Sequence, residues 1–176
     1  MEWIVLLFRV PAEPSRYRVA VWRELRRTGA VSLGQSAWLA PAAPVFADGI
    51  ARAVQLVQAA GGEAVVLDAS GRQPADAERL AEVYSAAREA EWTEFLADCA
   101  KYEAELDNEI RTKKFTLAEL EEEEQSLERL RRWHRDLRTR DLFGAPSATL
   151  AEQRLKHCAE RLEDYTQRVF HHLHQA

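Results

Sequence analysis

The sequence has too little of several residue types to fit the protein classes that depend on them. Two cysteines, Cys99 and Cys158, are too few for a disulfide-stapled scaffold. Seven glycines and six prolines among 176 residues exclude a collagen-like or low-complexity chain. No apolar run approaches the roughly 18 residues that span a membrane. The opening segment lacks the basic stretch and cleavage site of a secretory signal, so we expect a cytoplasmic protein without membrane contact.

Charge is spread unevenly along the chain. Apolar residues make up 47% of it and charged residues 30%, which is enough apolar material for a folded core. The net charge is −5. Residues 1–70 contain seven basic and six acidic residues, whereas residues 71–176 contain 17 basic and 23 acidic residues. This balance excludes a globally basic nucleic-acid binder and leaves room for a local basic surface in the first part.

Residues 1–70 alternate between strand-like and helix-like patterns. The patterns predict strands at 3–10, 30–33, 36–40 and 63–69 and helices at 16–28 and 46–60. A turn at Gly34-Gln35 would join the two middle strands. The resulting β-α-β-β-α-β order is that of a ferredoxin-like domain, in which two helices cover one face of an antiparallel sheet. Together with the helices that follow, it predicts an α+β protein.

Residues 71–176 contain no strand pattern and are predicted to be a helical domain. Apolar positions at helical spacing predict long helices at about 75–111, 117–140 and 149–174. Capping boxes, Thr116 with Glu119 and Thr149 with Glu152, mark two of the starts. Short connections between long helices predict an antiparallel three-helix bundle or hairpin. Both cysteines fall on the apolar seams and are expected to be buried, whereas the acidic run 121–124 is interpreted as a solvated face.

The first predicted helix is rich in arginine. At about 100° per residue, Arg16, Arg23 and Arg27 lie within roughly 40° of one another. Val21, Trp22 and Leu25 are expected on the opposite side, facing the sheet. Such guanidinium groups can bind DNA phosphates or a tetrahedral oxyanion. The alternative is a solvated face, paired with Glu24 and the acidic helices. The candidate binding residues are Arg16, Arg18, Arg23, Arg26 and Arg27.

Catalytic and metal-binding patterns are weak, so we expect no enzyme, no cofactor and no metal site. The histidines of the terminal HHLH segment are spaced poorly for one chelating helix face. The sequence has no nucleophile elbow, phosphate-binding loop or dinucleotide fingerprint. A metal nuclease on this fold would need a carboxylate at the end of the first strand, where Phe8, Arg9 and Val10 stand instead.

Several separated blocks resemble one known family. The first blocks are W-x-x-L-L-x-x-V-P-x-E-P-S from Trp3, R-x-x-x-W-R-x-L-R-R-x-G-A from Arg18, and S-x-W-L-x-P from Ser36. The later ones are F-T-x-x-E-L from Phe115, R-x-W-H at 131–134, and R-D-x-F-G-A from Arg140. These blocks look like the amino-terminal domain of the chromate-resistance regulator ChrB. More distantly, they are similar to the central domain of PaaX-type repressors, which shares the ferredoxin-like fold of a CRISPR-associated nuclease.

The resemblance implies a chromate-responsive transcriptional regulator that acts in the cytoplasm. Longer ChrB proteins carry a second, carboxyl-terminal domain, which this chain is expected to lack. The implied partners are operator DNA and chromate or another oxyanion, and we also expect a homodimer. The family residues that match here are the arginine-rich helix and the pair Arg140 and Asp141, which alternatively only ties the end of a helix. The competing functions are a protein–protein module without DNA binding and, third, a metal nuclease or chromate reductase.

Overall fold

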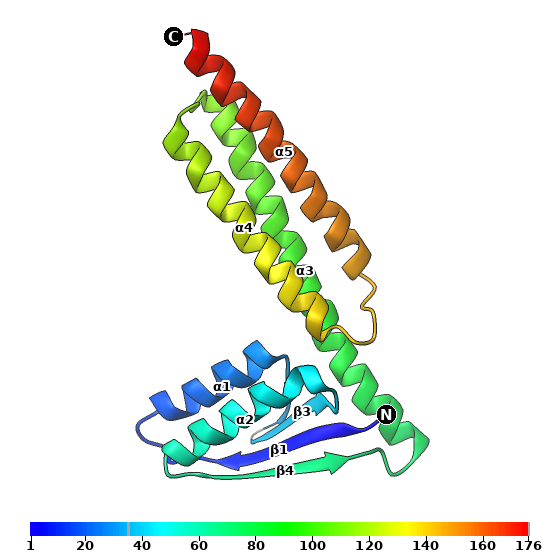
Figure 1. Cartoon of the computed structure of the whole chain (residues 1–176). Coiled ribbons are helices and arrows are strands. Elements are labelled where there is room, and N and C mark those ends of the chain that lie inside the picture. The colour runs from blue at the N-terminus through cyan, green and yellow to red at the C-terminus, as the bar shows by residue number, and fades with distance from the viewer. Residues whose placement is uncertain (35, 176) are drawn as a thin grey trace. The chain divides into compact units, whose positions relative to one another are not determined.

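The computed structural model describes residues 1–34 and 36–175 and contains a four-stranded antiparallel sheet and five helices (Figure 1). The predicted α+β class is therefore confirmed. Gln35, part of the predicted turn, lies outside the described residues. In chain order the elements are β1 (Trp3–Arg9), α1 (Arg16–Thr28), β2 (Val31–Gly34), β3 (Ala37–Pro41), α2 (Pro44–Ala59), β4 (Glu63–Ala69), α3 (Pro74–Thr112), α4 (Leu117–Arg140) and α5 (Ala148–Gln175).

Two compact units share helix α3. The first comprises Met1–Ala87 and the second Arg88–Ala176. The sequence places a division near residue 70, where strands give way to helices. The first turns of α3 nevertheless pack with the sheet, because the Tyr84 ring lies 5.8 Å from the Trp3 ring between centroids. Among the described residues, no helix is both long and apolar enough to cross a membrane.

The sheet of the first unit has the strand order β2-β3-β1-β4 with antiparallel neighbours. Strand β1 is central: its Leu6 pairs with Trp38 of β3 and with Val66 of β4. Strands β2 and β4 therefore form the two edges. The predicted β-α-β-β-α-β element order is confirmed, with strand ends shifted by at most one residue.

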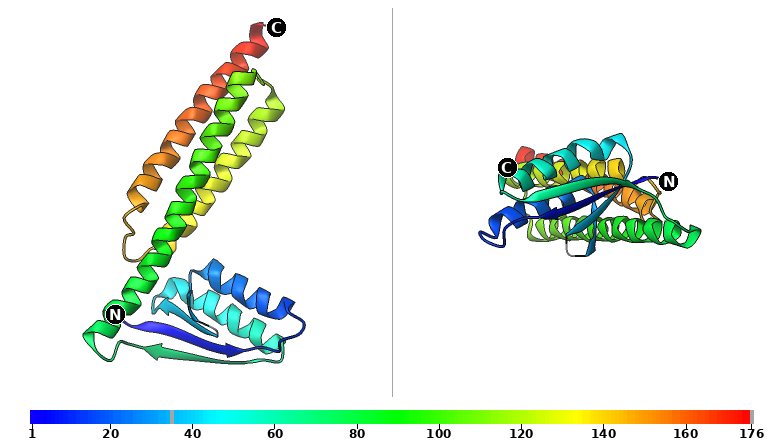
Figure 2. Two further views of the ribbon diagram at one scale, coloured as in Figure 1. Left: turned by 180° about the vertical axis from the view of Figure 1, so that it is seen from behind. Right: turned by 90° about the horizontal axis from the view of Figure 1, so that it is seen from below.

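Helices α1 and α2 lie together on one side of the sheet (Figure 2). From α1, Val21 and Leu25 are fully buried, as predicted. The prediction for Trp22 was wrong, since this residue is 44% exposed. On the helical wheel Trp22 lies beyond the sector that Val21 and Leu25 share, so the sheet does not cover it. Helix α1 ends at Gly29, whose φ of 95° suits glycine. The Gly29 N–H donates hydrogen bonds to the carbonyls of Leu25 and Arg26 in the last turn.

The second unit consists of the rest of α3 together with α4 and α5. Glu103 of α3 pairs with Arg154 of α5, and Asp107, one turn further along α3, pairs with Arg161, two turns further along α5. These pairs advance together along both helices, so α3 and α5 run in the same direction, while α4 returns alongside them (Figure 1). The core of the second unit is built from apolar side chains on the predicted helix seams. It includes Trp92, Phe95, Leu106, Leu127, Leu137, Tyr165, Val169 and both buried cysteines.

One of the two predicted capping boxes is present. The Thr116 side chain accepts a hydrogen bond of 3.2 Å from the Glu119 backbone N–H at the start of α4. The prediction for Thr149 was wrong, because α5 already begins at Ala148. Ser147 precedes this helix, and both its N–H and its hydroxyl donate to the Glu89 carboxylate of α3. The start of α5 is thus fixed by a neighbouring helix rather than by its own capping box.

Candidate functional site

Helix α1 presents all five predicted arginines at the molecular surface. Within the described residues, Arg27 is the one of the five in an ion pair: its Nη2 lies 2.6 Å from Oε1 of Glu24, and Arg52 of α2 approaches the same oxygen to 2.7 Å. Burial would raise the pKa of Glu24, but the hydrogen bonds and charges of Arg27 and Arg52 hold that pKa below its ordinary value. The predicted ion pairing with Glu24 therefore applies to Arg27.

The other four arginines have no carboxylate partner among the residues that the structure describes. Arg16 lies over the Tyr17 ring, 5.0 Å from its centroid. Arg18 donates a long hydrogen bond of 3.5 Å to the Ala12 carbonyl. Arg23 and Arg26 form neither a hydrogen bond nor an ion pair within that part of the chain. The positive charge of α1 is therefore largely uncompensated.

The exposed arginines form two rows. Arg16, Arg23 and Arg27 share the sector predicted from the sequence, whereas Arg18 and Arg26 lie one turn before and one turn after Trp22. The second row, with an indole between two guanidinium groups, was missed because Trp22 was assigned to the core. On the helical wheel Trp22 lies about 60° beyond Leu25, which makes it the residue of the three nearest the edge of the buried side, but the wheel alone does not tell where that edge falls.

The Arg140-Asp141 pair has a structural role in the second unit. Nη2 and Nε of Arg140 lie 2.9 and 3.2 Å from the two carboxylate oxygens of Glu91. The Asp141 carboxylate accepts from Trp92 Nε1 at 2.9 Å and from the Ala145 N–H at 2.9 Å. These contacts tie the end of α4 and the following turn to α3. They match the alternative interpretation, in which the pair secures the end of a helix.

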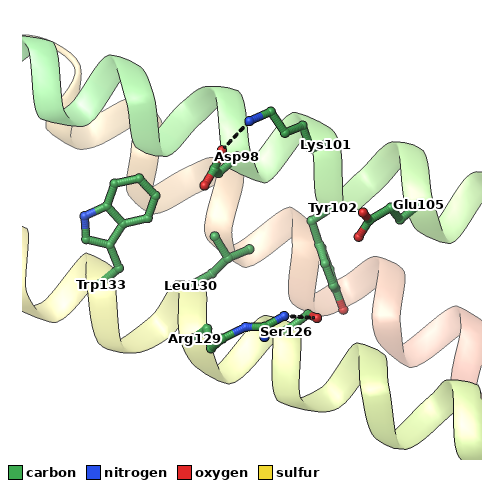
Figure 3. A pocket seen from close by; sticks show the side chains of 8 residues that line it. All are labelled: Asp98, Lys101, Tyr102, Glu105, Ser126, Arg129, Leu130 and Trp133. Atoms are coloured by element: carbon green, nitrogen blue, oxygen red, sulfur yellow. Dashed lines mark hydrogen bonds and ion pairs between the residues drawn. The ribbon is translucent and has the colours of Figure 1, made fainter.

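A groove of about 360 Å³ runs between α3 and α4 (Figure 3). Three of its four charged side chains are engaged within the protein, Glu105 being the fourth: Lys101 lies 2.8 Å from Asp98, and Arg129 donates to the Ser126 hydroxyl at 2.7 Å. The Tyr102 hydroxyl donates to a backbone carbonyl of α4. The groove therefore offers fewer uncommitted polar groups than α1 does.

The acidic run 121–124 is not a uniformly solvated face, so that prediction was wrong for Glu123. Glu123 is only 6% exposed, and its Oε2 has no hydrogen-bond partner in the described part of the chain. Burial, followed by the charges of Glu105 and Glu109, raises the pKa of Glu123 to about 7. The other three residues of the run are exposed. Within the described chain, no group of three or more His, Cys, Asp or Glu side chains could hold a metal ion.

Taken together, the sheet, the helices and the exposed arginines of α1 define a two-unit α+β protein with one strongly cationic helix at its surface. A family model described as "Protein ChrB, N-terminal" matches residues 18–176, so the chain belongs to this family and the resemblance is confirmed. Family membership suggests a regulator of chromate resistance. The match includes Arg18, Arg23, Arg26 and Arg27 but not Arg16. No curated protein and no solved structure matches the chain.

Proposed function

We propose that this protein is a non-enzymatic cytoplasmic regulator of chromate resistance and that α1 binds DNA phosphates. The observation that carries the proposal is the set of exposed arginines without a carboxylate partner among the described residues, namely Arg16, Arg18, Arg23 and Arg26. A guanidinium group binds phosphate or another tetrahedral oxyanion through paired hydrogen bonds. The chemistry therefore suits both DNA and chromate, and the experiments below separate the two.

The charge of α1 contrasts with that of the whole chain. Five arginines and one glutamate occur within its 13 residues, whereas the chain carries a net charge of −5. DNA would therefore be attracted to one helix and not to the molecule as a whole. Because binding to phosphates releases condensed counterions, the affinity should fall steeply as the salt concentration rises.

The strand order supports a ferredoxin-like arrangement for the first unit. Antiparallel strands in the order β2-β3-β1-β4, connected as β-α-β-β-α-β, have both helices on one side of the sheet. In such an arrangement one side of α1 packs on the sheet and the opposite side stays at the surface. The exposed row of Arg16 and Arg23 occupies that outer side.

Fluorescence anisotropy tests the DNA proposal. The probe is a labelled duplex from upstream of the protein's own operon, measured at two salt concentrations beside a random duplex. We expect Arg23→Glu/Arg26→Glu to weaken binding at least tenfold, because two phosphate contacts become repulsions. The matched control is Arg72→Glu/Arg79→Glu, which makes the same charge change at exposed positions outside α1. Equal affinities of the two double variants would remove α1 as the DNA surface.

A chromate titration of the same complex tests the oxyanion. Chromate and sulfate are compared at equal ionic strength, because both are tetrahedral dianions that screen charge alike. Release of DNA by chromate at concentrations where sulfate has no effect would support a chromate-responsive regulator. Identical curves would leave screening alone as the cause.

Self-association through β4 is a second candidate function. This strand is an edge of the sheet, and Val65, Val66 and Leu67 on it are 53%, 47% and 43% exposed. Exposed apolar edge strands tend to pair with another chain. Sedimentation at micromolar concentration should therefore detect a homodimer, and Val66→Lys should shift it to monomer. Unchanged sedimentation of the variant would exclude this edge as the interface.

A further inference from the structure

The first unit has a hollow of about 260 Å³ beside Trp22. Its lining comes from the end of β1 and the residue after it, from α1, and from the residue before β3: Phe8, Arg9, Val10, Arg18, Trp22 and Ser36. These residues include two guanidinium groups and one hydroxyl but no carboxylate. We propose that this hollow binds one unpaired nucleotide of a single-stranded nucleic acid, with the base on the Trp22 indole and its phosphates on Arg9 and Arg18.

The exposure of Trp22 supports the stacking part of this proposal. Trp3, Trp38 and Trp92 are at most 5% exposed, whereas Trp22 is 44% exposed on the surface of a helix. Leaving a large aromatic ring in water forgoes the stabilisation that burial would give. An exposed indole that borders a hollow is suited to stack on a base, because every base offers an aromatic face.

The charges around Trp22 support the phosphate part. Among the described residues, Arg18 has only its long contact to the Ala12 carbonyl, and Arg26 lies one turn along the helix on the other side of the indole. Arg9 pairs with Glu63 at 2.9 Å, but the two side chains are 81% and 78% exposed. Because so exposed a pair contributes little stability, Arg9 can exchange Glu63 for a phosphate without much loss. Arg9 and Arg18, the two cations that line the hollow with this ring, match the repeat of phosphate, base and phosphate along a strand.

The size of the hollow favours an unpaired base. At about 260 Å³ it lies just below the usual range of pockets for small organic ligands, so it has room for one base and not for a base pair. A base inside a duplex is stacked on both faces and cannot reach a ring on the protein surface unless it leaves the stack. This inference rests on the proposed function, since it takes α1 as a nucleic-acid surface, and it adds that one part of the surface prefers a single strand.

The test compares a labelled thymidine 20-mer with a labelled random 20-base-pair duplex by fluorescence anisotropy. Trp22→Ala should weaken binding of the single strand about tenfold and change binding of the duplex less than twofold. Trp22→Phe, which keeps an aromatic face, should restore most of the loss. Arg9→Gln/Arg18→Gln should also weaken binding of the single strand, whereas Arg72→Gln/Arg79→Gln is the matched control. Circular dichroism melting checks that each variant is folded.

The outcomes separate this inference from the proposed function. If Trp22→Ala and Arg9→Gln/Arg18→Gln bind the single strand as the unchanged protein does, the hollow is not a nucleotide site, even where Arg23→Glu/Arg26→Glu still abolishes duplex binding. Equal losses for single strand and duplex in Trp22→Ala would likewise overturn the preference for an unpaired base. Free thymidine monophosphate is the competitor in a last arm. If thymidine monophosphate displaces the 20-mer at a concentration equal to that of the binding sites, the ligand is a free nucleotide and not a strand.

Discussion

Gly49 of α2 lies directly against Thr28 of α1. A β-carbon added at Gly49 would stand 2.0 Å from Oγ1 of Thr28 and 2.4 Å from its Cγ2. The Thr28 hydroxyl donates to the Glu24 carbonyl at 2.8 Å, so the side chain is held in place. The close approach of these two helices therefore depends on the missing side chain at one position. It also fixes the orientation in which α1 presents its arginines.

Gly49→Ala should destabilise the protein. In a helix interior this substitution normally stabilises by about 1 kcal/mol, so any net loss reflects the clash with Thr28. We expect the free energy of unfolding to fall by about 1–3 kcal/mol, the usual range for overpacking, as measured by urea denaturation. The double variant Thr28→Ala/Gly49→Ala should recover part of the loss, because the nearest two atoms are removed. A stabilised Gly49→Ala protein would contradict the predicted clash.

Glu24→Gln should strengthen DNA binding. The Glu24 carboxylate neutralises Arg27 and Arg52, so its removal leaves two more uncompensated guanidinium groups beside the exposed rows. We expect a higher affinity for the duplex and a steeper decrease of the logarithm of affinity with the logarithm of salt concentration. Glu82→Gln, which removes an exposed charge from α3, is the control. An unaltered salt dependence in Glu24→Gln would count against α1 as the phosphate-binding surface.

Glu123 should make the stability of the protein depend on pH. Its pKa is raised from an ordinary 4.5 to about 7 in the folded protein, so the fold favours the protonated carboxyl. The contribution of Glu123 to stability is therefore fully present below about pH 4.5 and is lost as the pH rises towards 7. As the pH rises from 5 to 8, the free energy of unfolding of Glu123→Gln should increase by about 2 kcal/mol relative to that of the unchanged protein. The exposed Glu124→Gln serves as control, and parallel pH profiles of all three proteins would refute the prediction.

Asp141→Ala should loosen the end of α4. The carboxylate accepts from Trp92 Nε1 and from the Ala145 N–H, and its loss leaves both partly buried donors without that partner. The expected cost is about 2 kcal/mol in thermal or urea unfolding, with DNA affinity unchanged. Asp136→Ala removes an exposed carboxylate of the same helix as a control. A loss of DNA affinity without a loss of stability would restore this pair as a candidate binding site.

The helix and strand limits follow closely from the sequence because local signals define them. The strand order could not be predicted in this way. In the sheet Leu6 pairs with Trp38 and with Val66, which are distant in the sequence, so no local pattern reveals the pairing. The start of α5 was predicted one residue late because Ser147 is held by Glu89, a residue 58 positions away. Contacts that depend on distant residues are the ones that sequence patterns leave out.

The candidate site was predicted in its composition but not in its grouping. A helical wheel identifies which arginines share a side, but it does not tell how wide a sector the sheet covers. That width decided whether Trp22 is buried or exposed. Arg9 was considered only as a residue that stands where a nuclease needs a carboxylate, and its position at the hollow depends on the fold of β1 beside α1. Glu123 was missed for the same reason, since its burial arises from packing between helices.

The contact between Tyr84 and Trp3 bears on how the gene can be divided. A fragment that ends at residue 70, where the strands stop, would leave the Trp3 ring without the aromatic neighbour that lies 5.8 Å away. Phe46 would lose the same neighbour, at 6.3 Å. Such a fragment would offer two bare rings to other molecules and is expected to precipitate on expression. The smallest piece to clone for the sheet unit therefore extends to Ala87, well inside α3.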